Sequence, residues 1–256
     1  MIKYSDIFKF ITYLLVIFFV ILISFSFDNL STGSFKTLLN DNLFLKALKF
    51  GILSATFATF LSCIFGIPAG FFIARSKGKV IQLIDSFFDI PVVVPPLIIG
   101  VFILNFLSDE TVVKVTNMVF TFKGAVLAQF FISFPFTLKM SKNAFELVSP
   151  IYERIAMTLG AGYFKSFYDT TFKLALNGIL SGMILSWLRS FGEFGATLLV
   201  AGGIRGKTEN LPIYIYLNMM EGDYDKGIAA AFLGVLFVFV FIVTVRFIGN
   251  KKRGDV

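Results

Sequence analysis

The chain has 256 residues, of which 57% are hydrophobic and only 15% are charged. Soluble domains carry about 25% charged residues, so this composition, with a mean hydropathy of +0.84, indicates an integral membrane protein. The net charge is +7. The sequence contains no histidine, and this absence excludes imidazole-based acid–base chemistry and the commonest type of metal ligand.

Six long uncharged runs predict six transmembrane helices. They occupy residues 10–27, 50–74, 90–108, 124–138, 174–188 and 227–245. A helix needs about 20 residues to cross the hydrocarbon core, and the fourth and fifth runs reach that length only if flanking lysines extend them. Long continuous runs argue against a β-barrel, whose strands alternate apolar and polar residues. The sequence therefore predicts an all-α integral membrane protein with a single domain over residues 1–256.

The distribution of basic residues predicts that both chain termini face the cytoplasm. With six spans and the amino terminus inside, 14 lysines and arginines fall on the cytoplasmic side and 8 outside, and Arg189 is left in the membrane. The excess is largest at residues 75–79 and in the tail 251–253, in agreement with the positive-inside rule. Membrane topology therefore explains the basic charge. We expect a multi-pass membrane protein without a nucleic-acid partner.

The predicted spans contain two pairs of glycines and a stretch with several prolines. The patterns Gly66-x-x-x-Gly70 and Gly178-x-x-x-Gly182 predict close helix packing, because small residues let two backbones approach. Proline breaks or bends a helix, so we expect Pro91 to begin the third span and Pro95 and Pro96, in the next turn, to bend or break it. Such a break is either a static kink or a place where freed carbonyl groups face a cavity.

The longest predicted cytoplasmic segment, residues 142–171, contains an amphipathic helix. Ser149 and Pro150 form a helix start, because serine can cap free amide groups and proline has no amide group to satisfy. An apolar stripe follows, and Gly160 and Gly162 end it. A helix of this kind either rests on the lipid surface or fits a groove on a soluble partner.

Arg189 and Glu193 place opposite charges in a hydrophobic segment, where a charge at the bilayer centre costs about 2.5 to 3.5 kcal/mol. Four residues apart on one helix, they are expected to pair, either as a structural staple or as part of a transport path. If the helix begins near Phe172, Arg189 lies about 25 Å along it, in the outer half of the membrane. That depth favours a staple near the outer gate over a midplane ion site. The candidate path or gate residues are Arg189, Gly192, Glu193, Phe194, Gly195, Thr197, Pro95 and Pro96.

Several segments resemble one family. Residues 155–161, followed by residues 178–182, are similar to the EAA loop of ABC-importer permeases. Residues 91–100 and 192–197 resemble segments of the molybdate-type branch of that family, as do residues 66–70. The resemblance covers roughly residues 45–245, and implies the ABC type I importer permease fold. It also implies a transport subunit for molybdate or tungstate that works by alternating access and is not itself an enzyme.

In this family the EAA loop forms a coupling helix that docks into a cleft on a cytoplasmic ATPase. The implied coupling residues are Glu153, Arg154, Ile155, Ala156, Leu159, Gly160 and Ala161. Arg154 departs from the pattern, because the family has glutamate there, and Ile155 replaces an alanine. Lys173 and Asn177 replace prolines after the loop.

The resemblance also implies a location in the bacterial inner or plasma membrane and a set of partners. The partners are membrane lipid, a second copy of the permease, two cytoplasmic ABC ATPase subunits that bind ATP, and a periplasmic or extracellular oxyanion-binding protein. No catalytic, cofactor-binding or metal-ligating residue is expected in this chain.

Residues 201–208 match a relaxed Walker A pattern, but Pro212 follows closely and the predicted topology places the segment outside, away from ATP. The energy source is therefore expected on another chain. Three other functions stay open: a sulfate-type ABC permease, a stand-alone secondary anion transporter, and a structural subunit without a path. Molybdate, tungstate and sulfate share their shape and charge, so all three are candidate substrates.

Overall fold

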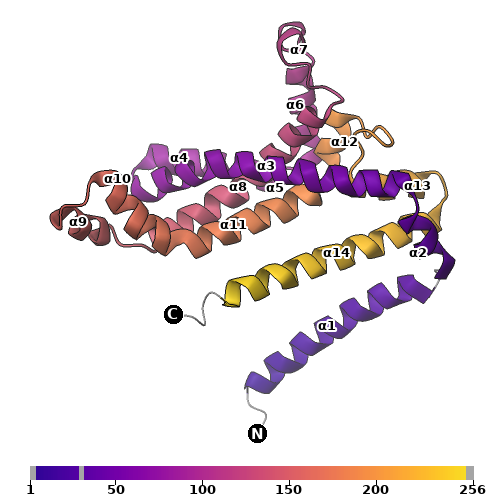
Figure 1. Cartoon of the computed structure of the whole chain (residues 1–256), viewed down its shortest axis with the longest axis horizontal. Helices are drawn as coiled ribbons and strands as arrows, with labels where there is room; N and C mark the ends of the chain where they lie inside the picture. The colour runs from indigo at the N-terminus through magenta and orange to yellow at the C-terminus, as the bar shows by residue number, and fades with distance from the viewer. Residues whose placement is uncertain (1–3, 29–31, 252–256) are drawn as a thin grey trace. The chain divides into compact units, whose positions relative to one another are not determined.

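The computed structural model describes residues 4–28 and 32–251, and all regular structure in these ranges is helical (Figure 1). The helices that contain five of the six predicted runs are α1 (Tyr4–Asp28), α3 (Asn42–Arg75), α8 (Phe122–Glu146), α11 (Lys173–Phe191) and α14 (Tyr224–Lys251). The third run is divided between α5 (Ile90–Val93) and α6 (Pro96–Leu107). The connecting elements are α2 (Thr32–Leu39), α4 (Lys79–Phe87), α7 (Glu110–Thr116), α9 (Ile151–Thr158), α10 (Tyr163–Ser166), the π-helical turn η1 (Phe167–Phe172), α12 (Gly195–Ala201) and α13 (Leu211–Met220).

Four helices within the described ranges are long and apolar enough to cross a membrane, and the number is five if one bent pair counts as a single span. The four are Ile7–Phe25, Asn42–Arg75, Tyr163–Phe191 and Tyr224–Phe247, and the bent pair joins Lys79–Val93 to Pro96–Leu107 at 106°. Helix α8 has 25 residues but is not among them, because polar residues such as Gln129 interrupt its apolar sequence. The six predicted spans are therefore found as helical regions, but length and composition alone do not confirm a count of six.

The chain forms two compact units, one of residues 1–45 with 214–256 and the other of residues 46–213. In the first unit, the rings of Phe35 on α2 and Phe232 on α14 are 5.6 Å apart. The buried Tyr214 donates a hydrogen bond of 2.7 Å from its hydroxyl to Asp41 Oδ2. The predicted basic tail, residues 251–253, falls almost entirely outside the described residues. The second unit contains both the predicted coupling segment and the predicted gate.

Helix α8 lies between α3 and α11 because glycines on both neighbours allow a close approach. A Cβ atom added at Gly70 of α3 would lie 2.8 Å from the carbonyl oxygen of Leu138 on α8. A Cβ atom added at Gly178 of α11 would lie only 2.5 Å from the Cβ of Ala144 on α8. Both predicted glycine pairs therefore face α8, which confirms their packing role.

We expect Gly178→Ala to lower the stability of the protein by about 1–3 kcal/mol, because the added methyl group overpacks the contact with Ala144. Gly51→Ala is the matched control, since its Cβ would lie 3.5 Å from Phe191, an ordinary contact. The measurement is thermal unfolding of the purified variants in detergent. Equal melting temperatures for the two variants would contradict the packing.

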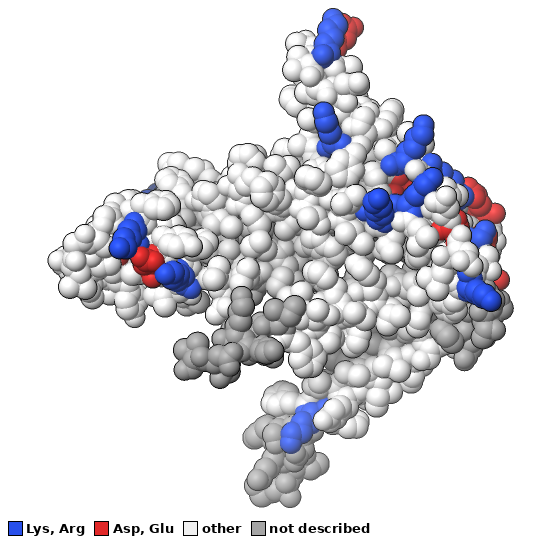
Figure 2. All heavy atoms as spheres, in the orientation of Figure 1, with Lys and Arg blue, Asp and Glu red and all other residues white. Residues whose placement is uncertain are grey.

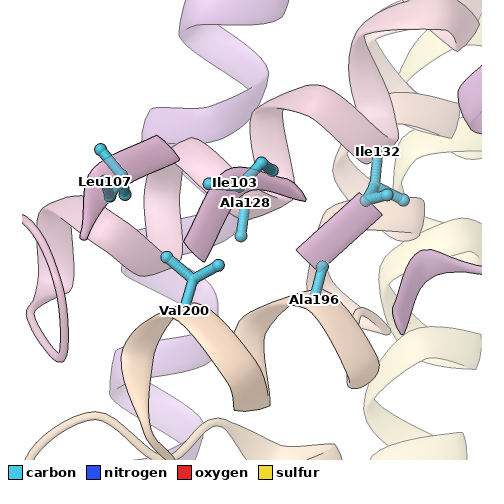
Figure 3. Close-up of a cluster of buried hydrophobic side chains, with 6 residues drawn as sticks. All are labelled: Ile103, Leu107, Ala128, Ile132, Ala196 and Val200. Carbon is cyan, nitrogen blue, oxygen red and sulfur yellow. The ribbon is translucent and has the colours of Figure 1, made fainter. Parts of the chain in front are cut away.

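A buried hydrophobic cluster joins α6, α8 and α12 in the same unit (Figure 3). Its buried side chains are Ile103, Leu107, Ala128, Ile132, Ala196 and Val200. A Cβ atom at Gly100 of α6 would lie 2.8 Å from the Cα of Ala196 on α12. The helix that follows the proline break is therefore fixed against α12.

The surface of the second unit fits a membrane protein. Figure 2 shows charged side chains near α9 and α10 at one end of this unit and near α12 at the other. Between these two ends, the side that faces the viewer has almost no charged side chains. Large apolar side chains of α3 in this unit, such as Phe57, Phe60 and Phe65, are exposed by more than half of their area. A monomeric soluble protein rarely exposes so much apolar surface, whereas lipid covers it without cost.

Candidate functional site

The predicted amphipathic helix of the 142–171 segment is α9. Its first backbone N–H group, at Ile151, donates to Ser149 Oγ over 3.4 Å, so the serine does bind a free amide group at the helix start, but the N-cap position is taken by Pro150 and not by Ser149. The helix ends where Gly160 takes a φ of +90°, a left-handed value that favours glycine. The N–H of Gly160 then donates to Met157 O and that of Ala161 to Ala156 O, each over 3.0 Å.

The apolar stripe of α9 faces outward. Ile151, Ile155 and Leu159 are exposed by 50%, 51% and 83% of their area. Of the predicted coupling residues, Arg154 and Gly160 are also exposed, whereas Glu153, Ala156 and Ala161 are half-buried. A short helix that displays three large apolar side chains needs a covering surface, as a groove on a partner or a lipid surface would supply.

The side chain of Glu153 contacts other residues of the same chain, unlike the exposed apolar side chains of α9. Its carboxylate Oε1 accepts a hydrogen bond from the hydroxyl of Thr171 and lies 3.9 Å from Nη2 of Arg75. Its backbone carbonyl accepts a hydrogen bond of 2.7 Å from the Ser166 hydroxyl. Glu153 therefore differs from the exposed coupling candidates, because its charge is already balanced within the chain.

The fifth predicted span begins earlier than expected. A start near Phe172 is wrong, because the helix runs without interruption from Tyr163 through α10 and η1 into α11. Three aromatic residues, Phe164, Phe167 and Tyr168, lie in its first turns. Arg189 consequently lies about 39 Å along this helix, but it still occupies the last turn, at the end opposite α9.

The gate segment begins where α11 ends, at Phe191, with Glu193 beyond it. The prediction that Arg189 and Glu193 share one helix is therefore wrong, because Gly192 terminates the helix before Glu193. The two side chains nevertheless pair, with 2.6 Å between Arg189 Nη1 and Glu193 Oε2. The other carboxylate oxygen accepts the N–H of Ala196 at 2.9 Å, so this carboxylate joins the end of α11 to the first turn of α12.

The backbone of Glu193 also takes part in a hydrogen bond. Asn210 Nδ2 donates to the Glu193 carbonyl over 2.6 Å, and Asn210 Oδ1 accepts the N–H of Ile213 in the first turn of α13. Glu193 is only 1% exposed, and Asn210 and its neighbour in the chain, Glu209, are buried too. The sequence did not single out Glu209 or Asn210, because their burial depends on a loop that folds back from α12.

The other gate candidates lie around the same break. Pro95 precedes α6, and a Cβ atom at Gly195 would lie 3.2 Å from the backbone nitrogen of Leu97, directly after Pro96. Thr197 is buried, Phe194 is half-buried and Gly192 is exposed. The structure thus brings the proline break and the Gly195 segment together, although more than 90 residues separate them in the chain.

An ion-pair network near α4 was not predicted. Lys139 Nζ lies 2.7 Å from Asp85 Oδ1 and 2.9 Å from the Asp89 carboxylate, and Lys142 Nζ lies 2.7 Å from Asp85 Oδ2 and 3.6 Å from Glu146. Helices α4 and α5 contain no buried residue, and these ion pairs connect α4 and the residue before α5, Asp89, to α8. The available signal was the i, i+4 spacing of Asp85 and Asp89 in an apolar stretch, which calls for a nearby cation.

The Walker A-like segment does not have the geometry of a phosphate-binding loop. Helix α12, not a strand, precedes it, and Gly202, Gly203 and Gly206 adopt positive φ values. The hydroxyl of Thr208 donates to Ala201 O over 2.6 Å and accepts the N–H of Ile204 at 3.0 Å. Its hydrogen-bonding capacity is therefore used to close the loop itself.

These features define an all-helical, multi-pass membrane protein that displays a short amphipathic helix between two of its long helices. A family model described as "binding-protein-dependent transport system inner membrane component" matches residues 66–253, and the chain belongs to this family. It is thus a membrane permease component of an ABC importer, a transport subunit and not an enzyme.

Three sequence relatives agree with this assignment. The probable transport system permease protein NifC of Clostridium pasteurianum is 33% identical over 214 residues, which cover 79% of this chain and 72% of the relative. The molybdenum transport system permease protein ModB of Mycobacterium bovis is 32% identical over 80% of this chain and 78% of its own length. The molybdate/tungstate transport system permease protein WtpB of Pyrococcus abyssi is 29% identical over 84% and 82%.

Solved structures show the same fold. A chain of a bacterial ABC transporter involved in the import of alginate aligns with a TM-score of 0.67 and 17% identity, over 98% of this chain and 94% of that chain. A chain of the alginate transporter in complex with an alginate-bound periplasmic protein gives a TM-score of 0.70 and 18% identity, over 98% and 93%. The predicted type I importer permease fold is confirmed.

Proposed function

We propose that this chain is the membrane-spanning subunit of an ABC importer for molybdate or tungstate. The observation that carries the proposal is the outward-facing apolar stripe of α9, with Ile155 and Leu159 exposed next to the left-handed Gly160. A stripe of this kind suits a groove on a cytoplasmic ATPase. The names of the relatives from Mycobacterium bovis and Pyrococcus abyssi support the choice of substrate.

The proposed assembly contains two copies of this permease, two cytoplasmic ATPase subunits that bind ATP, and an external oxyanion-binding protein. Each permease has both termini on the cytoplasmic side, forms one functional domain over residues 1–256, and needs no cofactor of its own. Closure of the ATPases moves the coupling loops, about residues 142–171, and opens the outer mouth by alternating access. The residues at Pro95, Pro96 and the segment 189–197 belong to the path or its gate.

The function is tested by reconstituting the permease with its ATPase and binding protein in liposomes and by measuring ATP-dependent uptake of labelled molybdate. We expect excess tungstate to compete and excess sulfate to compete far less. Effective competition by sulfate would favour the sulfate-type alternative. Uptake driven by an ion gradient in liposomes that contain this chain alone would instead indicate a secondary transporter, and would contradict the proposal.

A further inference from the structure

We propose that Glu153 is a positioning residue that transmits the movement of α9 to the transmembrane helices α3 and α11. The inference rests on the proposed function, because it assumes that an ATPase displaces α9. It goes beyond that function because it names the contact inside the permease that links the movement of α9 to the movement of the transmembrane helices.

The first observation is that, among the described residues, the hydrogen bonds and the charge contact between α9 and neighbouring helices are all made by Glu153. Within the part of the chain that the structure describes, no other side chain of α9 forms a hydrogen bond or ion pair with another helix. Thr171, which donates to the Glu153 carboxylate, is fully buried, and Ser166, which donates to the Glu153 carbonyl, is 1% exposed. A hydrogen bond to a charged group in a buried setting is stronger and more directional than a surface contact.

The second observation is that these contacts lead to two different long helices. Arg75 lies in the last turn of α3, 3.9 Å from the Glu153 carboxylate, which is a charge contact and not a hydrogen bond. The Arg75 guanidinium also lies 5.8 Å from the centre of the Phe71 ring, and Phe71 packs edge-on against Phe167 at 4.8 Å. One carboxylate therefore contacts the end of α3 and the beginning of the helix that continues as α11.

The third observation is the π-helical turn that carries Thr171. This turn, η1, has i→i+5 geometry and is inserted between two α-helical stretches of one continuous helix. Such turns are rare, and they are frequently found at functional sites. The turn places a buried hydroxyl against α9 at the point where the helix enters the bundle. Three elements, α3, α9 and η1, thus converge on Glu153.

The decisive variant is Thr171→Val, which removes the hydroxyl and keeps the shape of the side chain. Thr170→Val is the matched control, because the Thr170 hydroxyl donates to Ser166 O within its own helix. Both are assembled with ATPase and binding protein in liposomes. For Thr171→Val we expect normal co-purification of the ATPase, normal basal ATP hydrolysis, and a fall of about tenfold in substrate transported per ATP hydrolysed. Thr170→Val should behave as the wild type.

Two further variants distinguish a loss of coupling between α9 and the transmembrane helices from a general loss of stability. Thr171→Ser restores the hydroxyl and should restore coupling. Glu153→Gln removes the charge facing Arg75 and should lower the amount of substrate transported per ATP hydrolysed. If Thr171→Val transports as much per ATP as Thr170→Val, or if Thr171→Ser does not recover, the inference is wrong. Should the wild-type complex fail to bind the ATPase or to transport, the proposed function itself fails.

Discussion

Replacing Gly160 with aspartate is expected to abolish substrate-stimulated ATP hydrolysis by the assembled transporter while leaving the permease folded and able to dimerise. Nothing lies within 4 Å of a Cβ atom at this position, so the new side chain meets no neighbour inside the chain. Two effects act on docking. A φ of +90° is unfavourable for a residue with a side chain, and the carboxylate adds charge beside the exposed Leu159.

The control for this prediction is Gly162→Asp. Gly162 has a φ of −66°, which any residue adopts, and nothing lies within 4 Å of its Cβ position. The same charge is thus introduced two residues away without backbone strain. We expect Gly162→Asp to keep most of the stimulated hydrolysis. Undiminished hydrolysis with Gly160→Asp would remove α9 from the coupling contact, and equal losses in both variants would point to a general effect of surface charge.

The sequence predicted the local features of α9 well, because they depend on residues close together in the chain. Ser149 marks the start of the helix and Gly160 its end, and the apolar spacing gives its exposed face. The orientation of Glu153 could not be predicted in this way. It follows from the hydroxyl of Thr171, 18 residues later in the chain, which lies in the π-helical turn before α11.

Contacts between distant segments account for the other differences. The sequence predicted that the lysines flanking the fourth and fifth runs extend these spans. In the structure, Lys139, which follows the fourth run, pairs with Asp85 and Asp89, which lie 54 and 50 residues earlier. Likewise, the prolines predicted a break in the third span, but not that the helix after the break packs against α12. Apolar periodicity carries no information about which helix a given face meets.

The pair of Arg189 and Glu193 yields the second prediction of large effect. Arg189→Met is expected to lower stability by about 3 kcal/mol, because it leaves the carboxylate of Glu193, only 1% exposed, without its cation. The double variant Arg189→Met with Glu193→Gln should be more stable than Arg189→Met alone, since it removes the uncompensated charge and keeps an oxygen that can accept the N–H of Ala196. The measurement is thermal unfolding of the four proteins of this cycle in detergent.

Transport by the double variant then decides between the two interpretations of the pair. If the charges only staple α11 to α12, uptake should recover together with stability, because the glutamine amide oxygen would still hold the first turn of α12. If the pair rearranges when the gate opens, uptake should stay low although stability has recovered, since a neutral pair no longer favours one of the two arrangements. Equal stability of the single and double variants would mean that Arg189 does not balance the charge of Glu193, and neither interpretation would survive.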